Sequence, residues 1–198
     1  MQEIVLASGN PGKLRELDNL LEPLGWQVRS RKAFDVPEPE ETGLTFVENA
    51  LIKARNAAQS TGLAALADDS GLAVDALGGR PGIYSARYSG PEGDDEANNR
   101  KLVAELGDLP PEQRGAFYHC SLVLLTHAED PCPIIAEGQW RGRIGLEPRG
   151  EGGFGYDPLF ELPERGCTSA ELDPEEKDAI SHRGKAMRRL REEIRERW

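Results

Sequence analysis

The chain has 198 residues, of which 38% are hydrophobic and 22 are glycines, and this composition excludes wholesale disorder. At roughly 150 residues per domain, the length predicts one large domain or two closely associated lobes. The 24 Lys and Arg residues against 35 Asp and Glu residues give a formal net charge of −11, which argues against a nucleic-acid partner bound through a basic face.

The cysteines and the first residues bear on the cellular compartment. Cys120, Cys132 and Cys167 form no C-x-x-C pair, and their odd number cannot be fully paired within the chain, so we expect reduced thiols. Met1–Ser8 carries an acidic residue and only a short apolar run, and no segment approaches the roughly 18 apolar residues of a membrane span. We therefore expect a cytoplasmic protein with no membrane partner.

The first predicted elements are a strand, a glycine loop and a helix. Ile4–Ala7 is a short apolar run that reads as a buried strand, and it ends in the loop Ser8–Gly12. Leucines from Leu14 to Leu24 recur at the spacing of one helical face, and Gly25 stands where a C-terminal cap belongs.

A connection and a second helix follow. Arg31–Thr42 is rich in proline and acidic residues and predicts an extended surface connection. Thr45 and Glu48 match a capping box, which predicts an alanine-rich helix through about Gln59. The next buried strand is predicted at Leu63–Ala67 and runs directly into two aspartates.

The second half of the chain continues the alternation. Gly78–Gly82 predicts a turn, Asp94–Leu106 a helix closed by glycine, and Ala116–Thr126 and Pro133–Ile144 two strands joined by a polar turn. Ser181–Trp198 predicts a charged helix with one apolar face. Alternating strands and helices predict an α/β fold whose strand-end loops supply the site, and the two neighbouring strands favour a mixed sheet.

The first glycine loop has two interpretations. Glycines before a helix start favour anion binding, but the loop is not a Walker A motif, because its glycines are too close together and Leu14 follows Lys13. Ser8 and Asn10 could donate to phosphate oxygens, and Lys13 could act there as a point charge. An ordinary strand-to-helix turn explains the loop equally well.

Acidic residues and a lysine on separate segments could hold a metal. Neighbouring side chains in an extended segment point to opposite faces, so one of Asp68 and Asp69 faces a given cleft unless a turn reorients them. Either of them with Glu41, or with its neighbour Glu40, would meet the preference of Mg²⁺ for carboxylate oxygens. The alternatives are a capping turn after Asp69 and a solvated Lys53.

The second glycine loop, Gly150–Gly155, matches a dinucleotide fingerprint, but a proline blocks the helix that should follow. Phe154 and Asp157 instead predict a base-stacking shelf with a hydrogen-bond acceptor, and the alternative is a surface turn with a half-buried Phe. Arg183 at a helix N-terminus opposes the macrodipole, which points to a ligand, although Ser181 also reads as an ordinary N-cap.

Motifs spread along the whole chain form one ordered pattern: Ser8-x-Asn10-x-x-Lys13, Glu41-Thr42-Gly43-x-Thr45-Phe46-x-Glu48-Asn49-Ala50, Ala67-Asp68-Asp69-Ser70-Gly71-Leu72, Gly78-Gly79-x-Pro81-Gly82-x-Tyr84-Ser85-Ala86-Arg87, Gly153-Phe154-Gly155-Tyr156-Asp157-Pro158, and Lys177 with Ser181-His182-Arg183-Gly184. The pattern closely resembles the bacterial non-canonical purine nucleoside triphosphate pyrophosphatases, the inosine/xanthosine triphosphatase family. The resemblance implies a single domain over residues 1–198, with two lobes, a cleft between them, and a long mixed twisted sheet flanked by helices. It also implies a homodimer that uses Mg²⁺ to hydrolyse ITP, dITP and XTP to the monophosphate and pyrophosphate.

The resemblance also implies roles for individual residues. Asp69 would be the general base, supported by Asp68 and Lys53, and Glu41 and Asp69 would organise the metal. The phosphates would be bound by the loop residues Ser8, Gly9, Asn10, Pro11, Gly12 and Lys13. The nucleoside pocket would be lined by Ser70, Phe154, Gly155, Tyr156, Asp157, Lys177, His182 and Arg183.

Donor counting then predicts the preferred purine. Arg183 and Lys177 donate and never accept, so they can satisfy the 6-oxo group of hypoxanthine or xanthine but leave the 6-amino group of adenine unpaired. One alternative is a Maf-type nucleotide pyrophosphatase, against which the motif Ser181–Arg183 argues. The other is a non-catalytic nucleotide-binding module, which would not keep the acidic residues.

Overall fold

The computed structural model describes residues 2–197, apart from the side chain of Pro11. Within these residues the strands form a seven-stranded sheet in the order β2-β1-β3-β4-β5-β6-β7. The strands are β1 (Gln2–Leu6), β2 (Trp26–Ser30), β3 (Ala64–Val74), β4 (Gly115–Leu125), β5 (Ile134–Ile144), β6 (Phe160–Leu162) and β7 (Cys167–Thr168). Strand β1 pairs in parallel with β2 and β3, whereas β6 is antiparallel to β5 and β7. The predicted mixed sheet is therefore confirmed.

The helices are α1 (Pro11–Leu21), α2 (Phe46–Thr61), α3 (Asp95–Leu106), α4 (Pro174–Ile180) and α5 (His182–Arg197). None of the helices in the described part of the chain is long and apolar enough to cross a membrane. The chain divides into two compact units. Unit 1 comprises the residues up to Asp69, Cys120–Gly138 and the residues from Lys185 on, and unit 2 comprises Ser70–His119 and Gln139–Gly184.

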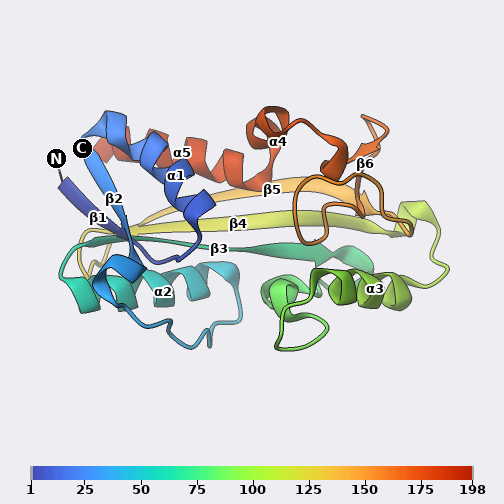
Figure 1. The fold of residues 1–198 in the computed structure, drawn as a ribbon, viewed down its shortest axis with the longest axis horizontal. Coiled ribbons are helices and arrows are strands. Elements are labelled where there is room, and N and C mark those ends of the chain that lie inside the picture. Colours follow the sequence, from blue (N-terminus) through green and yellow to red (C-terminus); the bar gives the residue numbers. More distant parts are fainter. Residues whose placement is uncertain (1, 198) are drawn as a thin grey trace. The chain divides into compact units, whose positions relative to one another are not determined.

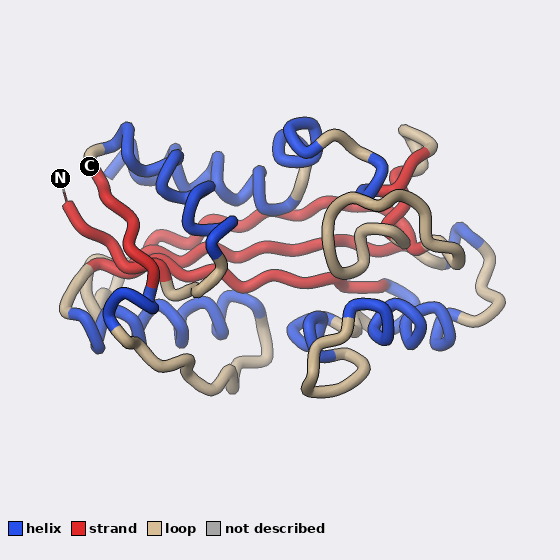
Figure 2. The backbone as a smooth tube through the Cα atoms, viewed as in Figure 1, coloured by secondary structure: helices blue, strands red, loops and turns tan. Residues whose placement is uncertain are grey.

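In unit 1, both faces of the sheet are covered by helices. Helices α1 and α5 lie on one side and α2 on the other (Figures 1 and 2). Successive residues of β1 alternate between the two faces, because side chains in a strand point to opposite sides. Ile4 packs in one core with Leu21 of α1 and Leu190 of α5, whereas Val5 packs in another with Ala57 of α2.

Unit 2 has its own core, built around Phe160. The Phe160 ring lies 4.7 Å from that of Tyr118 on β4 and 5.2 Å from that of Trp140 on β5, measured between centroids. Leu102 and Leu106 of α3 belong to the same cluster. The glycine loop with Phe154 and helix α4 also belong to this unit.

Local capping signals predicted several helix boundaries correctly. Thr45 accepts from the N–H of Glu48, and the Glu48 carboxylate accepts from the N–H of Thr45, so the predicted capping box is present at the start of α2. The helix predicted at Asp94–Leu106 is α3, which has Asp94 as its N-cap and ends at Gly107, as predicted. The first leucine helix ends in a short 3₁₀ turn before Gly25.

Other predictions about the elements were wrong. The strand that was expected to end at Ala67 continues through the aspartates to Val74, so the capping turn after Asp69 does not form. Arg31–Phe34 is a 3₁₀ helix rather than extended chain. Strands β2, β6 and β7 and helix α4 were not predicted. The strands β6 and β7 have too few residues to show an alternating pattern, but α4 did carry a signal, because Asp173 caps it and a proline opens it.

Asp130 stabilises the turn between β4 and β5. Its Oδ2 accepts from the N–H and hydroxyl of Thr126 at 2.9 and 2.7 Å, and its Oδ1 accepts from the N–H of Cys132 at 2.8 Å. Burial raises the pKa of Asp130, but these hydrogen bonds outweigh it, so the pKa is lowered. A lowered pKa means that the ionised form adds stability above the unfolded pKa of about 3.9, and that this stability is lost as the pH falls.

Asp130→Ala is therefore expected to lower the free energy of unfolding by about 1–3 kcal/mol at neutral pH, because three donors lose an ionised acceptor. The difference from the unchanged chain should shrink as the pH falls below about 4. Urea denaturation at a series of pH values measures both effects. An equal loss at every pH would contradict the role assigned to the carboxylate.

Candidate functional site

The first glycine loop joins β1 to α1 in unit 1. The Asn10 side chain caps α1, since its Oδ1 accepts from the N–H groups of Gly12 and Lys13 at 2.8 and 3.3 Å. The Ser8 hydroxyl accepts from the N–H of Asn10 at 3.2 Å. A Cβ at Gly9 would meet the side chain of Lys32 at 2.5 Å, so the glycine lets this lysine approach the loop. Lys32 was not predicted to lie near the loop, because it belongs to a segment that the sequence indicated to be a surface connection.

The two neighbouring aspartates of β3 contact different lysines. Asp68 forms an ion pair of 2.5 Å with Lys13 of α1, and Asp69 forms one of 2.7 Å with Lys53 of α2. Helices α1 and α2 cover opposite faces of the sheet in unit 1 (Figure 1), so the two aspartates are paired with lysines from helices on different faces. Lys53 also lies 3.1 Å from a carboxylate oxygen of Glu41. The structure thus brings together Glu41, Lys53 and Asp69.

Burial and charge shift the pKa values of this cluster. Burial lowers the pKa of Lys53, but the charge and hydrogen bond of Asp69, with the charges of Asp68 and Glu41, outweigh it, so the pKa is raised. Burial raises the pKa of Asp69, and the charge and hydrogen bond of Lys53 offset this only in part. Lys53 is therefore cationic at neutral pH, and Asp69 is a stronger base than an ordinary carboxylate.

The carboxylates of this cluster fit a divalent cation. The Asp69 Oδ2 atom is buried and makes no hydrogen bond, and a buried acceptor without a partner costs free energy. No group of three or more His, Cys, Asp or Glu side chains in the described residues converges on a metal position. Mg²⁺ commonly needs only one or two carboxylates, because water and substrate phosphates complete its shell. Glu41 and Asp69 are the candidate ligands.

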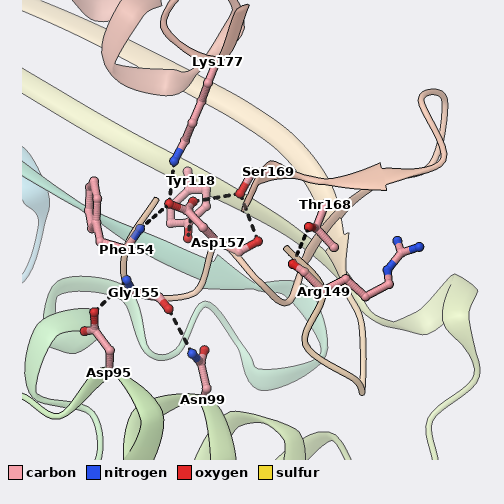
Figure 3. Close-up of polar contacts among 10 residues, drawn as sticks. All are labelled: Asp95, Asn99, Tyr118, Arg149, Phe154, Gly155, Asp157, Thr168, Ser169 and Lys177. Atoms are coloured by element: carbon pink, nitrogen blue, oxygen red, sulfur yellow. Dashed lines mark hydrogen bonds and ion pairs between the residues drawn. The ribbon is translucent and has the colours of Figure 1, made fainter. Parts of the chain in front are cut away.

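The second glycine loop of unit 2 is organised by Asp157, which is 3% exposed. Its Oδ2 accepts from the N–H of Phe154 at 2.8 Å and from Nζ of Lys177 at 2.5 Å, and its Oδ1 accepts from the hydroxyl of Ser169 at 2.8 Å (Figure 3). Phe154 is 66% exposed, and Lys177 Nζ lies 5.4 Å from the centroid of its ring. The structure therefore holds an exposed aromatic ring and a lysine side by side, and both oxygens of Asp157 accept from groups of the protein itself.

His182 and Arg183 lie in the first turn of α5. The Ser181 hydroxyl accepts from the N–H of Gly184 at 3.1 Å, so Ser181 is an N-cap as the sequence indicated. The His182 ring stacks on Tyr118, with centroids 4.8 Å apart and planes inclined by 13°. The Tyr118 hydroxyl in turn lies 3.4 Å from Oδ1 of Asp157.

Tyr118 was missed by the sequence analysis, because an aromatic residue in a buried strand reads as core. Burial raises its pKa well above the usual value, and the charge of Asp157 adds to this, so the phenol is neutral and donates. Tyr156 is also buried, and its hydroxyl donates to the carbonyl of Ser85 at 2.7 Å. The side chain of Tyr156 thus serves the core of unit 2, and Ser70 lies within β3 in the same unit.

The model of the Ham1 family matches residues 4–193. The chain belongs to the Ham1 family. This Ham1 chain is 58% identical to a dITP/XTP pyrophosphatase of Yersinia pseudotuberculosis serotype I, over 99% of the chain and 100% of that relative.

Solved structures of Ham1 proteins share the fold. A HAM1 protein from Coxiella burnetii matches with a TM-score of 0.94 and 49% identity, over 99% of this chain and 100% of that one. The Ham1 protein of Staphylococcus aureus matches with a TM-score of 0.92 and 38% identity, over the full length of both chains. The sequence prediction of the family is confirmed, and so is the α/β fold with a mixed sheet flanked by helices.

Proposed function

We propose that this chain is a nucleoside triphosphate pyrophosphatase that hydrolyses ITP, dITP and XTP to the monophosphate and pyrophosphate. The observation that carries the proposal is the Asp69–Lys53 pair, in which one buried carboxylate oxygen makes no hydrogen bond. A carboxylate with a raised pKa and one oxygen that makes no hydrogen bond can take a proton from water. A carboxylate that served only in a structural ion pair would need neither property. A relative that is 58% identical over its full length is a dITP/XTP pyrophosphatase, and this supports the substrate class.

Unit 1 would carry out the phosphate chemistry. Lys13 and the N-terminus of α1 would bind phosphate oxygens, because both favour negative charge. Asp69 would orient the attacking water and accept its proton, and Lys53 would keep that carboxylate in place. The divalent cation, which we propose to be Mg²⁺ held by Glu41 and Asp69, would neutralise phosphate charge when bound.

Unit 2 would recognise the base. The exposed ring of Phe154 offers a stacking surface, and Lys177 and Arg183 offer donors for a 6-oxo group. Asp157 would act by holding Lys177 and the N–H of Phe154, since both of its oxygens accept from the protein. His182, which is stacked on Tyr118, would contribute from the first turn of α5.

We also propose that the two units act as lobes of one nucleotide pyrophosphatase domain over residues 1–198, in a cytoplasmic homodimer. Within the described residues Cys120, Cys132 and Cys167 form no disulfide, which agrees with a reducing compartment. The Maf-type alternative is disfavoured by the dITP/XTP activity named for the relative.

The product pattern tests the proposed function. ITP should yield IMP and pyrophosphate in one step, because the resemblance to the inosine/xanthosine triphosphatase family implies that water attacks the α-phosphorus. The measurement is chromatography of early time points with ITP, dITP, XTP, GTP and ATP in the presence of Mg²⁺, together with a pyrophosphate assay. Accumulation of IDP before IMP would overturn the proposed reaction.

A further inference from the structure

Helix α3 holds the loop of Phe154 through one glycine of unit 2. The Asp95 carboxylate accepts from the N–H of Gly155 at 2.8 Å, and the Asn99 side-chain amide donates to the carbonyl of Gly155 at 2.9 Å (Figure 3). Asp95 and Asn99 are one helical turn apart, so they project from the same face of α3. Both backbone polar groups of Gly155 are therefore bound by this helix.

The loop is also held by Asp157, whose Oδ2 accepts from the N–H of Phe154 at 2.8 Å. Gly153 and Gly155 have φ angles of 78° and 60°, a region in which glycine is the usual residue. A Cβ at Gly153 would collide with the carboxylate of Asp157, so the loop must keep this glycine and the freedom that it gives the backbone. The side chain of Phe154 adds little packing, because the ring is mostly exposed.

An apolar cavity of about 630 Å³ lies between α3 and this loop. Its lining includes Val103 of α3, Leu146 and Leu159, and Phe154 itself borders it. An exposed aromatic ring gains free energy when it enters such a cavity. A loop that was free to move could therefore turn the Phe154 ring toward this cavity, and the two contacts of α3 with Gly155 oppose that movement.

We propose that Asp95 and Asn99 are positioning residues that keep Phe154 exposed for stacking of the purine base. Neither residue is proposed to touch the base, and both act through Gly155. This inference rests on the proposed function of unit 2 as the base-recognition unit. The two contacts of Asp95 and Asn99 with Gly155 form what we call the clamp. Because the chemistry is assigned to residues of unit 1, loss of this clamp should weaken binding of the nucleotide and leave the hydrolytic step intact.

The test compares Asp95→Ala and Asn99→Ala with matched controls. Each variant should raise the KM for ITP by about 2- to 13-fold, the effect of one hydrogen bond, and change kcat by less than about twofold. Asp95→Asn retains an oxygen acceptor and should restore the KM. Glu96→Ala removes the same charge from the same turn of α3 but leaves both contacts with Gly155 in place, so its KM should be unchanged.

Amide hydrogen exchange of residues 150–157 gives a readout that does not depend on activity. The loop should exchange faster in Asp95→Ala and Asn99→Ala than in the unchanged chain, and not in Glu96→Ala. Unchanged exchange would overturn the clamp, and faster exchange with an unchanged KM would overturn its role in base binding. If the unchanged chain does not hydrolyse ITP, the proposed function fails, and the exchange of the loop still decides whether the clamp exists.

Discussion

Asp69→Asn is expected to lower kcat for ITP by about 10²- to 10⁴-fold, the usual contribution of a general base. Asparagine has nearly the shape of aspartate and can still accept the hydrogen bond of Lys53, but it cannot take a proton from water. It also removes a negative charge from the proposed metal site. Steady-state kinetics with Mg²⁺ measure the loss, and a kcat close to that of the unchanged chain would remove Asp69 from the mechanism.

The same substitution should leave the fold intact. The pKa of Asp69 is raised in the folded state, so the ionised carboxylate destabilises the folded state. The contribution of Asp69 to the stability is therefore greatest below its unfolded-state pKa and is lost as the pH rises through its folded-state pKa. Asparagine removes this cost, whereas Lys53 loses one attraction and keeps those of Glu41 and Asp68. Because these effects oppose each other, the melting temperature should change by no more than about 4 °C.

A matched control separates the effect of losing the general base from the effect of losing one negative charge of an aspartate in unit 1. Asp35 is exposed and has a φ angle of 52°, a conformation that asparagine also tolerates. Asp35→Asn should therefore retain both activity and stability. A large loss of kcat in this control would mean that the net charge, rather than the Asp69 carboxylate, sets the rate.

Arg183→Ala is expected to reduce strongly the preference for 6-oxo purines over adenine. If the guanidinium donates to the 6-oxo group, its loss should lower kcat/KM for ITP by about 10- to 150-fold, the range for a hydrogen bond to a charged group. The poor rate with ATP should hardly change, because adenine offers no acceptor at that position. The measurement is kcat/KM for ITP, XTP and ATP with the same enzyme preparation.

Arg188→Ala is the control on the same helix, because Arg188 is an exposed arginine of α5 with no proposed part in binding. It should change all nucleotides alike and by little, as surface substitutions usually do. Equal losses with ITP and ATP in Arg183→Ala would overturn the donor argument. The selectivity would then be assigned to Lys177, His182 or the backbone of the Phe154 loop.

Much of this fold was readable from short stretches of sequence. The capping box at Thr45 and the glycine at Gly107 each satisfy helix-end groups within a few residues, so they act alike in any tertiary context. The leucines of α1 and the alternating residues of β1 report which faces are buried, because burial follows the helical and strand periods. The candidate site residues stay predictions, which rest on the match of their types and order along the chain to those of a known family.

Tertiary contacts decided the rest. Nothing local extends β3 through Asp68 and Asp69; the strand continues because its neighbours in the sheet supply the hydrogen bonds. The pairing of Asp68 with Lys13 joins residues 55 positions apart, and that of Asp95 with Gly155 joins residues 60 apart. Such partners cannot be inferred from spacing, because packing of whole elements brings them together. For the same reason Tyr118, a core residue by its sequence pattern, proves to be the surface on which His182 stacks.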